Sequence, residues 1–545
     1  MSADSVLDNL LTRQFDNVSK RLSGHQIHGH LPKLGTRLVL AGIGIGVTLI
    51  ISVPLLLLVL EGAMAGPANI GSLIWRPLTG MLIWNTVRVT AVASAACAVV
   101  GTLSAWCVER TNVPFRRLWS VLLVLPFAVP DFVMSFGWSS VSDLVSGYWG
   151  ALLIMTLGLY PLVYLTVAAS LRSADSGLEE AARALGAGRI ETFVRVTLRQ
   201  CRAAILGGTA LVALILLAEY GAFENLGYQT LTTEINTQLS VSFNVSAACV
   251  LSLLLVGIGI VILGGGAAAS GQARTLTHAG PLVPHPVHRH KVGPMRWVIA
   301  AGLAALVGLA LGVPVGSVIY WMFEGGYQSP GGASVVDAGW HTLLYAGAAA
   351  AVATVLAVPV AFIAVRSRAR LPRVMARATY LVLSMPSRVV AVAFAYFSFT
   401  YLDGLGYQST QLLILIYAIL FFPLALVAVA ASMTYVPAAL EEAARSLGTP
   451  SFRSFGRITL PLLAPGMAAG FALVFIGCTT EVSATLMLAP TGVQTLATQF
   501  WAYQHNLSYG QAAPFALTMI ALAAVPGFVL ARYFNRLPSR ATGSR

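Results

Sequence analysis

Long apolar runs separated by short polar loops dominate the pattern of this chain. A helix of about 20 apolar residues crosses a bilayer core about 30 Å thick. Twelve runs reach that length, six on each side of a polar stretch at residues 267–296. The pattern therefore predicts an all-α, polytopic membrane protein with spanning helices near residues 38–60, 84–108, 118–138, 149–171, 203–223, 243–266, 297–322, 342–365, 378–402, 410–433, 463–486 and 513–531.

The same pattern divides the chain into two six-helix halves with polar segments around them. The predicted parts are an N-terminal tail, a first half, a linker, a second half and a C-terminal tail, at residues 1–37, 38–266, 267–296, 297–531 and 532–545. The tail is too polar and charged for a cleaved signal peptide, so we expect the first apolar run to remain in the protein as a spanning helix.

Composition and charge agree with a membrane protein and give it an orientation. Only 10% of the residues are charged, whereas a soluble domain carries about 25%. Of the 33 lysines and arginines, 30 lie in the tails, the linker and alternate loops, which the positive-inside rule assigns to the cytoplasm. We therefore expect both tails to be cytoplasmic. The net charge of +13 then faces anionic lipid and cytosolic partners, and no nucleic acid partner is needed to explain it.

Cysteines and histidines give no sign of a metal framework. The five cysteines lie in or beside apolar runs without C-x-x-C spacing, which indicates small core residues. Two groups of histidines occur in the tail and the linker, at His25, His28, His30, His278, His285, His288 and His290. Cytosolic metal binding is one interpretation of these groups, but the interspersed prolines Pro281, Pro284 and Pro286 favour an interdomain linker.

The two halves contain an internal repeat. Residues 178–198 and 440–460 are identical at 12 of 21 positions at a fixed offset of 262. The same offset relates Pro161 to Pro423 and Glu219 to Glu481. Two six-helix units that enter the membrane from the same side form parallel repeats about an axis along the membrane normal. We therefore expect a substrate path between the halves.

The repeated loop reads Glu-Ala-Ala, three further residues and Gly, and it resembles the EAA loop of the binding-protein-dependent type I ABC importer permeases. The resemblance implies a permease in the bacterial cytoplasmic membrane, whose coupling helices dock into two copies of an ATPase subunit, and an extracytoplasmic substrate-binding protein. The implied coupling residues are Glu179, Glu180, Ala181, Ala182, Gly186, Glu441, Glu442, Ala443, Ala444 and Gly448. The second copy ends in Leu460-Pro461, as the family pattern asks, while the first has Arg199 at the proline position.

Local physics supports a docking role for this loop. An apolar stripe suited to a groove is formed by Leu178, Ala181, Ala182 and Leu185. Gly186 and Gly448 stand where a helix needs a left-handed C-terminal turn. As an alternative, Glu179 could close a capping box with Ser176, but the second copy has Ala438 at that place. We therefore prefer docking.

The chain lacks the residues of an ATP site. The phosphate-binding pattern G-x-x-x-x-G-K-[ST] does not occur, and none of the three lysines follows a glycine. We therefore expect a transport subunit that is not itself an enzyme and binds no cofactor, with ATP and magnesium held by the partner subunits.

Four ionisable residues fall inside predicted spans, where such residues are costly and usually functional. They are Asp131, Glu219, Arg388 and Glu481, and Tyr220 follows Glu219. At 1.5 Å per residue from the repeated loops, both glutamates lie roughly 20 Å into the membrane. In one interpretation the carboxylates pair with Arg388 and hold the bundle together. In the other they form an acidic vestibule on the substrate path, which the matching positions of Glu219 and Glu481 favour.

These side chains also bear on the cargo. Carboxylates and a phenol are hard oxygen ligands suited to a highly charged cation, so Glu219 and Glu481 are predicted to bind metal transiently. The segments around both glutamates most resemble ferric-iron importer permeases, and the resemblance implies ferric iron as cargo. Permeases for thiamine, aminoethylphosphonate or polyamine are the alternatives within the family. An ion-driven secondary transporter, with the two glutamates as proton sites, is the alternative outside it, but such a carrier has no use for paired EAA loops.

Overall fold

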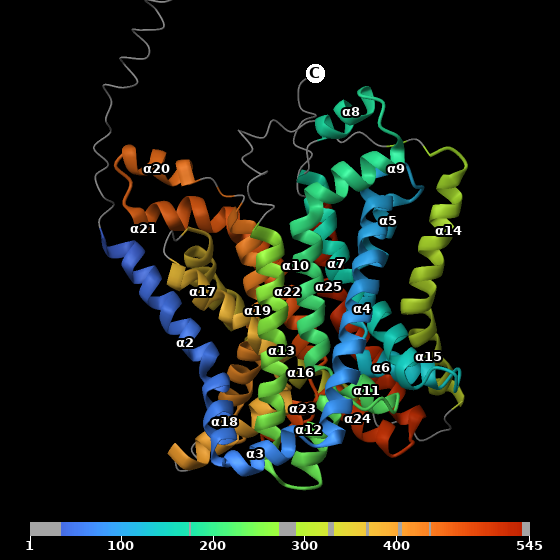
Figure 1. Ribbon diagram of the computed structural model, residues 1–545, viewed down its shortest axis with the longest axis vertical. Helices are drawn as coiled ribbons and strands as arrows, with labels where there is room; N and C mark the ends of the chain where they lie inside the picture. Colours follow the sequence, from blue (N-terminus) through green and yellow to red (C-terminus); the bar gives the residue numbers. More distant parts are fainter. Residues whose placement is uncertain are drawn as a thin grey trace, which may run out of the picture.

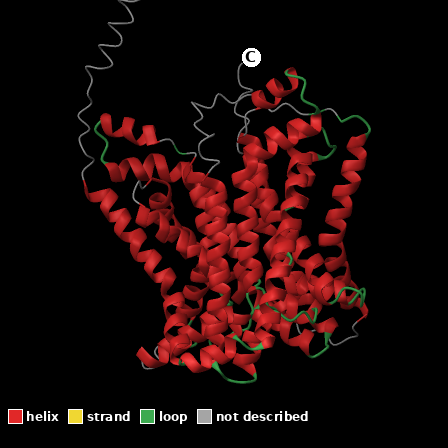
Figure 2. Cartoon of the chain, in the orientation of Figure 1, coloured by secondary structure: helices red, strands yellow, loops and turns green. Residues whose placement is uncertain are grey.

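The computed structural model describes residues 34–173, 176–271, 290, 292–324, 332–366, 370–401, 406–434, 436 and 438–536. In these residues helices are joined by short loops, and the only β-type pairing is an isolated bridge between Thr111 and His290 (Figure 2). The histidines of the N-terminal tail, and those of the linker other than His290, lie outside the described residues.

The first half contains long helices connected by short ones. Its helices are α2 (Leu34–Met64), α3 (Pro67–Ile74), α4 (Pro77–Arg110), α5 (Arg116–Leu122), η1 (Leu125–Ala128), α6 (Asp131–Ser139), α7 (Gly147–Ser173), α8 (Ser176–Ala184), α9 (Arg189–Thr192), the π-helix η2 (Phe193–Thr197), α10 (Leu198–Ala218), α11 (Gly221–Asn225), α12 (Leu231–Ser240) and α13 (Val245–Gly271).

The second half follows the same order. Its helices are α14 (Met295–Val307), the π-helix η4 (Gly308–Gly312), α15 (Val313–Glu324), α16 (Gly332–Arg366), α17 (Arg370–Ala378), η5 (Thr379–Ser384), α18 (Ser387–Tyr401), α19 (Thr410–Thr434), α20 (Ala438–Ser446), α21 (Ser451–Ser454), the π-helix η6 (Phe455–Thr459), α22 (Leu460–Thr479), α23 (Ser483–Leu488), α24 (Leu496–His505) and α25 (Tyr509–Arg536).

Two predicted spans are broken rather than continuous. Among the described residues ten helices are long and apolar enough to cross a membrane, and two bent pairs bring the number to twelve. The pairs replace the expected spans 118–138 and 378–402, with bends of 91° and 106°. Each break lies at a proline, Pro130 or Pro386, which lacks an N–H and disfavours helical backbone in the residue before it. Val129 and Met385 are accordingly extended.

Two further predicted spans end earlier than expected. The runs 203–223 and 463–486 were predicted as continuous helices, but α10 ends at Ala218 and α22 at Thr479. The short helices α11 and α23 follow each break. Glu219 and Glu481 therefore lie at helix breaks and not within helices.

The long helices of each half pack in the same way. In the first half α4 packs on α7 and α10, and in the second half α16 packs on α19 and α22. Gly101 allows close approach in the first half, because a Cβ there would lie 2.8 Å from the Cβ of Val163 on α7. The first span of each half also reaches the other half: α2 contacts α16, and α15, the last part of the span Met295–Glu324, contacts α6.

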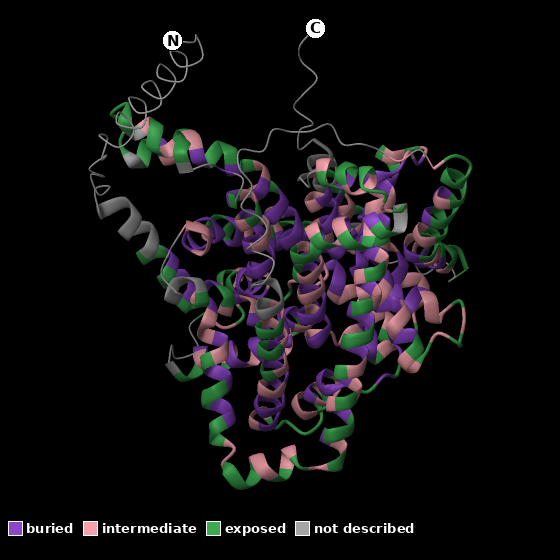
Figure 3. Ribbon diagram, turned by 45° about the horizontal axis from the view of Figure 1, so that its top comes forward, coloured by how far each residue is buried: buried purple, intermediate pink, exposed green. Residues whose placement is uncertain are grey.

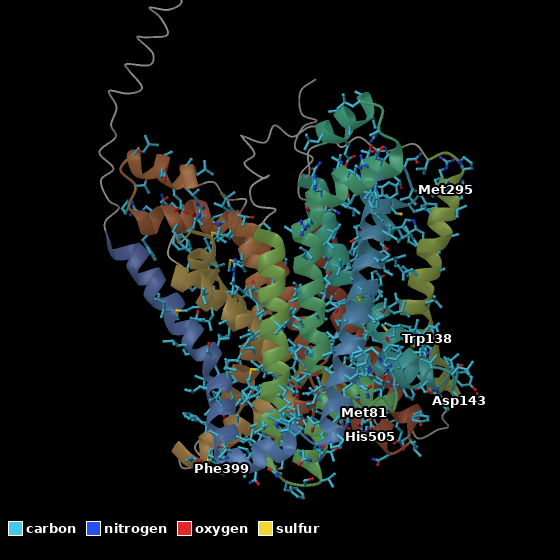
Figure 4. All side chains as sticks on the ribbon, viewed as in Figure 1. Met81, Trp138, Asp143, Met295, Phe399 and His505 are labelled. Carbon is cyan, nitrogen blue, oxygen red and sulfur yellow. The ribbon has the colours of Figure 1, made fainter. Side chains whose placement is uncertain are left out.

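The repeated loops lie at one end of the molecule. Helices α8, α9, α20 and α21 gather at the top in Figure 1, whereas α3, α12 and α18 lie toward the bottom. Met295, at the start of α14, lies toward the end that carries the repeated loops, while Phe399 and His505 lie toward the opposite end (Figure 4). Buried residues run through the middle of the bundle (Figure 3). Large apolar side chains such as Val261 and Val298 are exposed on the outside, as a lipid-facing surface requires.

Candidate functional site

The repeated loops form two short helices with the same C-terminal turn. Gly186 has φ 90° and Gly448 has φ 81°, which confirms the predicted left-handed turn. The bond of a Schellman motif follows in each copy: the Ala187 N–H donates to Ala182 O at 3.0 Å, and the Thr449 N–H donates to Ala444 O at 3.0 Å. The turn redirects the chain from α8 into α9 and from α20 into α21.

The two glutamates of each loop face opposite ways. Glu179 is buried, its carboxylate accepts a hydrogen bond from Thr197 Oγ1 at 3.0 Å, and Arg110 Nη2 lies 3.6 Å away. Glu180 is exposed. Glu179 therefore turns toward α4 and η2, and its carboxylate contacts the membrane helices.

The second loop repeats this arrangement. The Thr459 hydroxyl donates to Glu441 Oε1 at 2.6 Å, and Arg366 Nη2 lies 4.0 Å from the same oxygen. Glu442 is exposed. In each half an arginine at the end of a long helix, a threonine at the end of a π-helix and the first glutamate of the loop therefore form a brace.

Aromatic pairs support both braces. Trp106 on α4 packs edge-on against Phe193, with ring centroids 5.2 Å apart, and Phe362 on α16 packs edge-on against Phe455 at 6.2 Å. The phenylalanines and the brace threonines are among the identical positions of the repeat. That identity was the available signal, but π-helices have no sequence pattern that would have located the contacts.

The outward face of each loop is apolar and open. The leucines at its ends are exposed, at Leu178, Leu185, Leu440 and Leu447. The last two are the repeat partners of the first two. Each half therefore presents one exposed glutamate beside an unburied apolar stripe at the same end of the molecule (Figure 1).

A cavity of about 120 Å³ lies between the two halves. Side chains from both contribute to it, and it is lined by Phe132, Ala218, Glu219, Tyr220, Gly221, Thr232, Ile235, Asn236, Pro386, Ser387, Arg388, Thr480, Glu481, Val482, Ser483, Leu486 and Trp501. The structure thus brings together four predicted path residues, Glu219, Tyr220, Arg388 and Glu481.

Each glutamate is held at the helix break of its own half. Glu219 Oε1 accepts the Ala222 N–H at 2.9 Å, and Glu481 Oε1 accepts the Ala484 N–H at 2.9 Å. The Ser387 hydroxyl adds a hydrogen bond to Glu481 at 2.8 Å. The breaks free backbone N–H groups that fix both carboxylates at the cavity wall.

Arg388 does not neutralise these carboxylates. Its Nη1 donates to Ser240 Oγ at 3.0 Å. Among the ion pairs between described residues, none joins it to Asp131, Glu219 or Glu481. The ion pair of the first interpretation is therefore not formed among the described residues in this conformation.

Asp131 lies behind the cavity rather than on its wall. It interacts electrostatically with Glu219 and packs so closely on α7 that a Cβ at Gly158 would lie 2.5 Å from its Oδ1. Within the described part of the chain, no group of three or more His, Cys, Asp or Glu side chains could hold a metal ion.

Sequence reasoning missed several wall residues that the repeat could have located. Asn236 on α12 and Trp501 on α24 are related by an offset of 265, the same offset that relates the Gln-Thr-Leu sequences at 229 and 494. Both helices begin with a threonine capping box. Asn236 also donates to the Tyr220 hydroxyl at 2.8 Å.

A comparison with protein families identifies this architecture. The family of binding-protein-dependent transport system inner membrane components matches residues 98–268 and, a second time, residues 353–541. The chain belongs to this family. It is therefore a multi-pass inner membrane component of a binding-protein-dependent ABC transport system, and the two matches correspond to its two halves.

The relatives of this chain differ in how much of its length they match. An Fe(3+)-transport system permease protein of Haemophilus influenzae, FbpB 2, is 33% identical over 88% of this chain and 95% of its own length. The sulfate transport system permease protein CysT of Salmonella typhimurium is 28% identical over 43% of this chain and 90% of its own length. A probable molybdenum ABC transporter permease of Haloferax volcanii is 27% identical over 39% of this chain and 86% of its own length.

Proposed function

We propose that this permease carries ferric iron inward, driven by ATP hydrolysis on separate subunits. The observation that carries the proposal is the similarity to the Fe(3+)-transport permease, which extends over both halves. The sulfate and molybdenum relatives each cover less than half of this chain. A substrate-binding protein on the outer side would deliver the cargo.

The cavity chemistry supports a cation as cargo. Glu219 and Glu481 reach its wall from equivalent breaks, and Tyr220 and Asn236 add further oxygen atoms. Hard oxygen ligands suit a highly charged cation. A sulfate or phosphonate would meet two carboxylates and a single guanidinium, that of Arg388, on the cavity wall, so repulsion between like charges outweighs attraction there.

The coupling side of the proposal rests on the two loops. Two ATPase subunits would dock on α8 and α20, because each offers an exposed glutamate and an apolar stripe. The loops would then lie in the cytoplasm, with both tails on the same side, and ATP and magnesium would bind to the ATPase subunits. Closure of those subunits would move the halves apart or together around the cavity and so alternate its access.

The test is uptake of radioactive ferric iron by proteoliposomes that contain permease and ATPase, with the binding protein outside. We expect uptake to require ATP on the ATPase side and to persist when a protonophore collapses the proton gradient. Glu180→Arg with Glu442→Arg should abolish uptake and ATPase binding. Glu324→Arg, at an exposed glutamate that ends α15 at the other end of the bundle, is the matched control and should transport normally.

Two results would revise the proposal. Uptake that needs a proton gradient and no ATP would indicate a secondary transporter. ATP-driven uptake of thiamine, aminoethylphosphonate or polyamine, without iron, would keep the permease and replace its cargo.

A further inference from the structure

One histidine of the interdomain linker is attached to the first repeated loop. The backbone N–H of His290 donates to Arg110 O at 2.8 Å, and its carbonyl accepts the Asn112 N–H at 3.3 Å. Two residues on, the Val292 N–H donates to Asn112 Oδ1 at 3.0 Å. These bonds fix the linker to the end of α4, beside the first brace.

The side chain of His290 reaches into that brace. Its Nε2 lies 3.1 Å from Arg183 Nη2 and 4.0 Å from Glu179 Oε2. Its ring lies 6.3 Å from that of Trp106. Because a guanidinium can only donate, Nε2 is the acceptor and the ring proton is on Nδ1. His290 therefore accepts a hydrogen bond from Arg183, which belongs to α8, and it also faces the Glu179 carboxylate.

The side chains of the two braces differ in exposure. The side chains of Glu179 and Arg110 are 3% and 0% exposed, whereas those of Glu441 and Arg366 are 16% and 19% exposed. Among the described residues the arginines also differ, because Arg366 Nη2 donates to the backbone oxygen of Val436 at 2.6 Å, whereas His290 faces the carboxylate of the first brace. The first repeated loop is thus held by a linker residue, His290, and its brace is less exposed than that of the second loop.

We propose that His290 is a positioning residue that orients the first coupling helix, α8, for its ATPase subunit and makes the two docking sites unequal. The linker between the halves then acts on coupling and does more than connect them. This inference rests on the proposed docking role of α8 and α20.

The experiment titrates purified ATPase subunit onto the full-length permease in lipid nanodiscs and follows ATP hydrolysis. His290→Ala should raise the half-saturating ATPase concentration about ten-fold or more, the effect of losing one hydrogen bond to a charged group. The maximal rate at saturating ATPase should be unchanged, because the docked complex is the same. His290→Gln keeps a side-chain acceptor and should restore the affinity to within about two-fold of wild type.

A double-mutant cycle separates positioning from a general loss of stability. If His290 acts through its hydrogen bond to Arg183, His290→Ala combined with Arg183→Met should bind ATPase no more weakly than Arg183→Met alone. Combined with Glu441→Gln in the other half, the same change should multiply the separate effects, because those sites do not touch. If alanine lowers the yield of folded protein, His290→Asn takes its place in both cycles.

Wild-type affinity in His290→Ala, or multiplied effects with Arg183→Met, would overturn the positioning role. Failure of the underlying proposal has a different signature. If Glu180→Arg with Glu442→Arg still bind ATPase normally, the loops are not the docking sites. If the Glu180→Arg and Glu442→Arg variant loses ATPase binding while His290→Ala does not, only the positioning role of His290 is wrong.

Discussion

Single residues at the ends of α8 and α20 set where the chain turns. Gly186 and Gly448 adopt positive φ, and a Cβ at either would meet no atom within 4 Å. The cost of a side chain there is therefore backbone strain alone, about 1 kcal/mol for left-handed backbone. Sequence reasoning could identify these glycines because the Gly follows an amphipathic stretch at a fixed spacing.

Replacing both glycines by alanine should disturb docking without unfolding the membrane helices. We expect Gly186→Ala with Gly448→Ala to weaken ATPase binding about five-fold or more, through the strain at each turn. Gly188→Ala is the control, because that glycine has equal space but no positive φ. The readout is ATPase retained on the permease in a pull-down from detergent. Equal retention by both variants would show that the turn does not position the helix.

At the scale of elements, the apolar runs predict how many segments enter the membrane but not where they break. Pro130 and Pro386 were visible inside two runs, yet a proline also kinks spanning helices without ending them. At Glu219 and Glu481 no proline marks the break, and their runs remain apolar on both sides. The glutamates could be named from their charge and repeat positions, while the cavity they share depends on packing between halves.

The packing of α4 on α7 gives an element-scale prediction. A Cβ at Gly101 would lie 2.8 Å from Val163 Cβ and 2.9 Å from the carbonyl oxygen of Tyr160. Gly101→Ala should therefore push the helices apart and cost about 1–3 kcal/mol of stability. Gly257→Ala, in α13 with open space, should cost far less. Thermal unfolding in detergent compares them, and equal midpoints would contradict this packing.

For the whole molecule, the repeat predicts the composition of the complex. One chain carries both loops, so two ATPase subunits should bind a single permease. Mass measurement of the purified complex checks this, and two permease chains per complex would contradict it. Because His290 contacts only one of the two loops that we propose as docking sites, the two ATPase subunits should bind with unequal affinity. A titration of ATPase subunit onto the permease should then show two binding steps.

The most direct measurement is ferric iron uptake by the variant Glu219→Gln with Glu481→Gln. Both carboxylates line the cavity and neither is paired with Arg388, so removing their charge should abolish ATP-driven iron uptake with little change in volume. ATPase binding and membrane insertion should be unaffected, because the loops lie at the other end of the bundle (Figure 1). Uptake of ferric iron at the wild-type rate by this variant would contradict a cation path through the cavity.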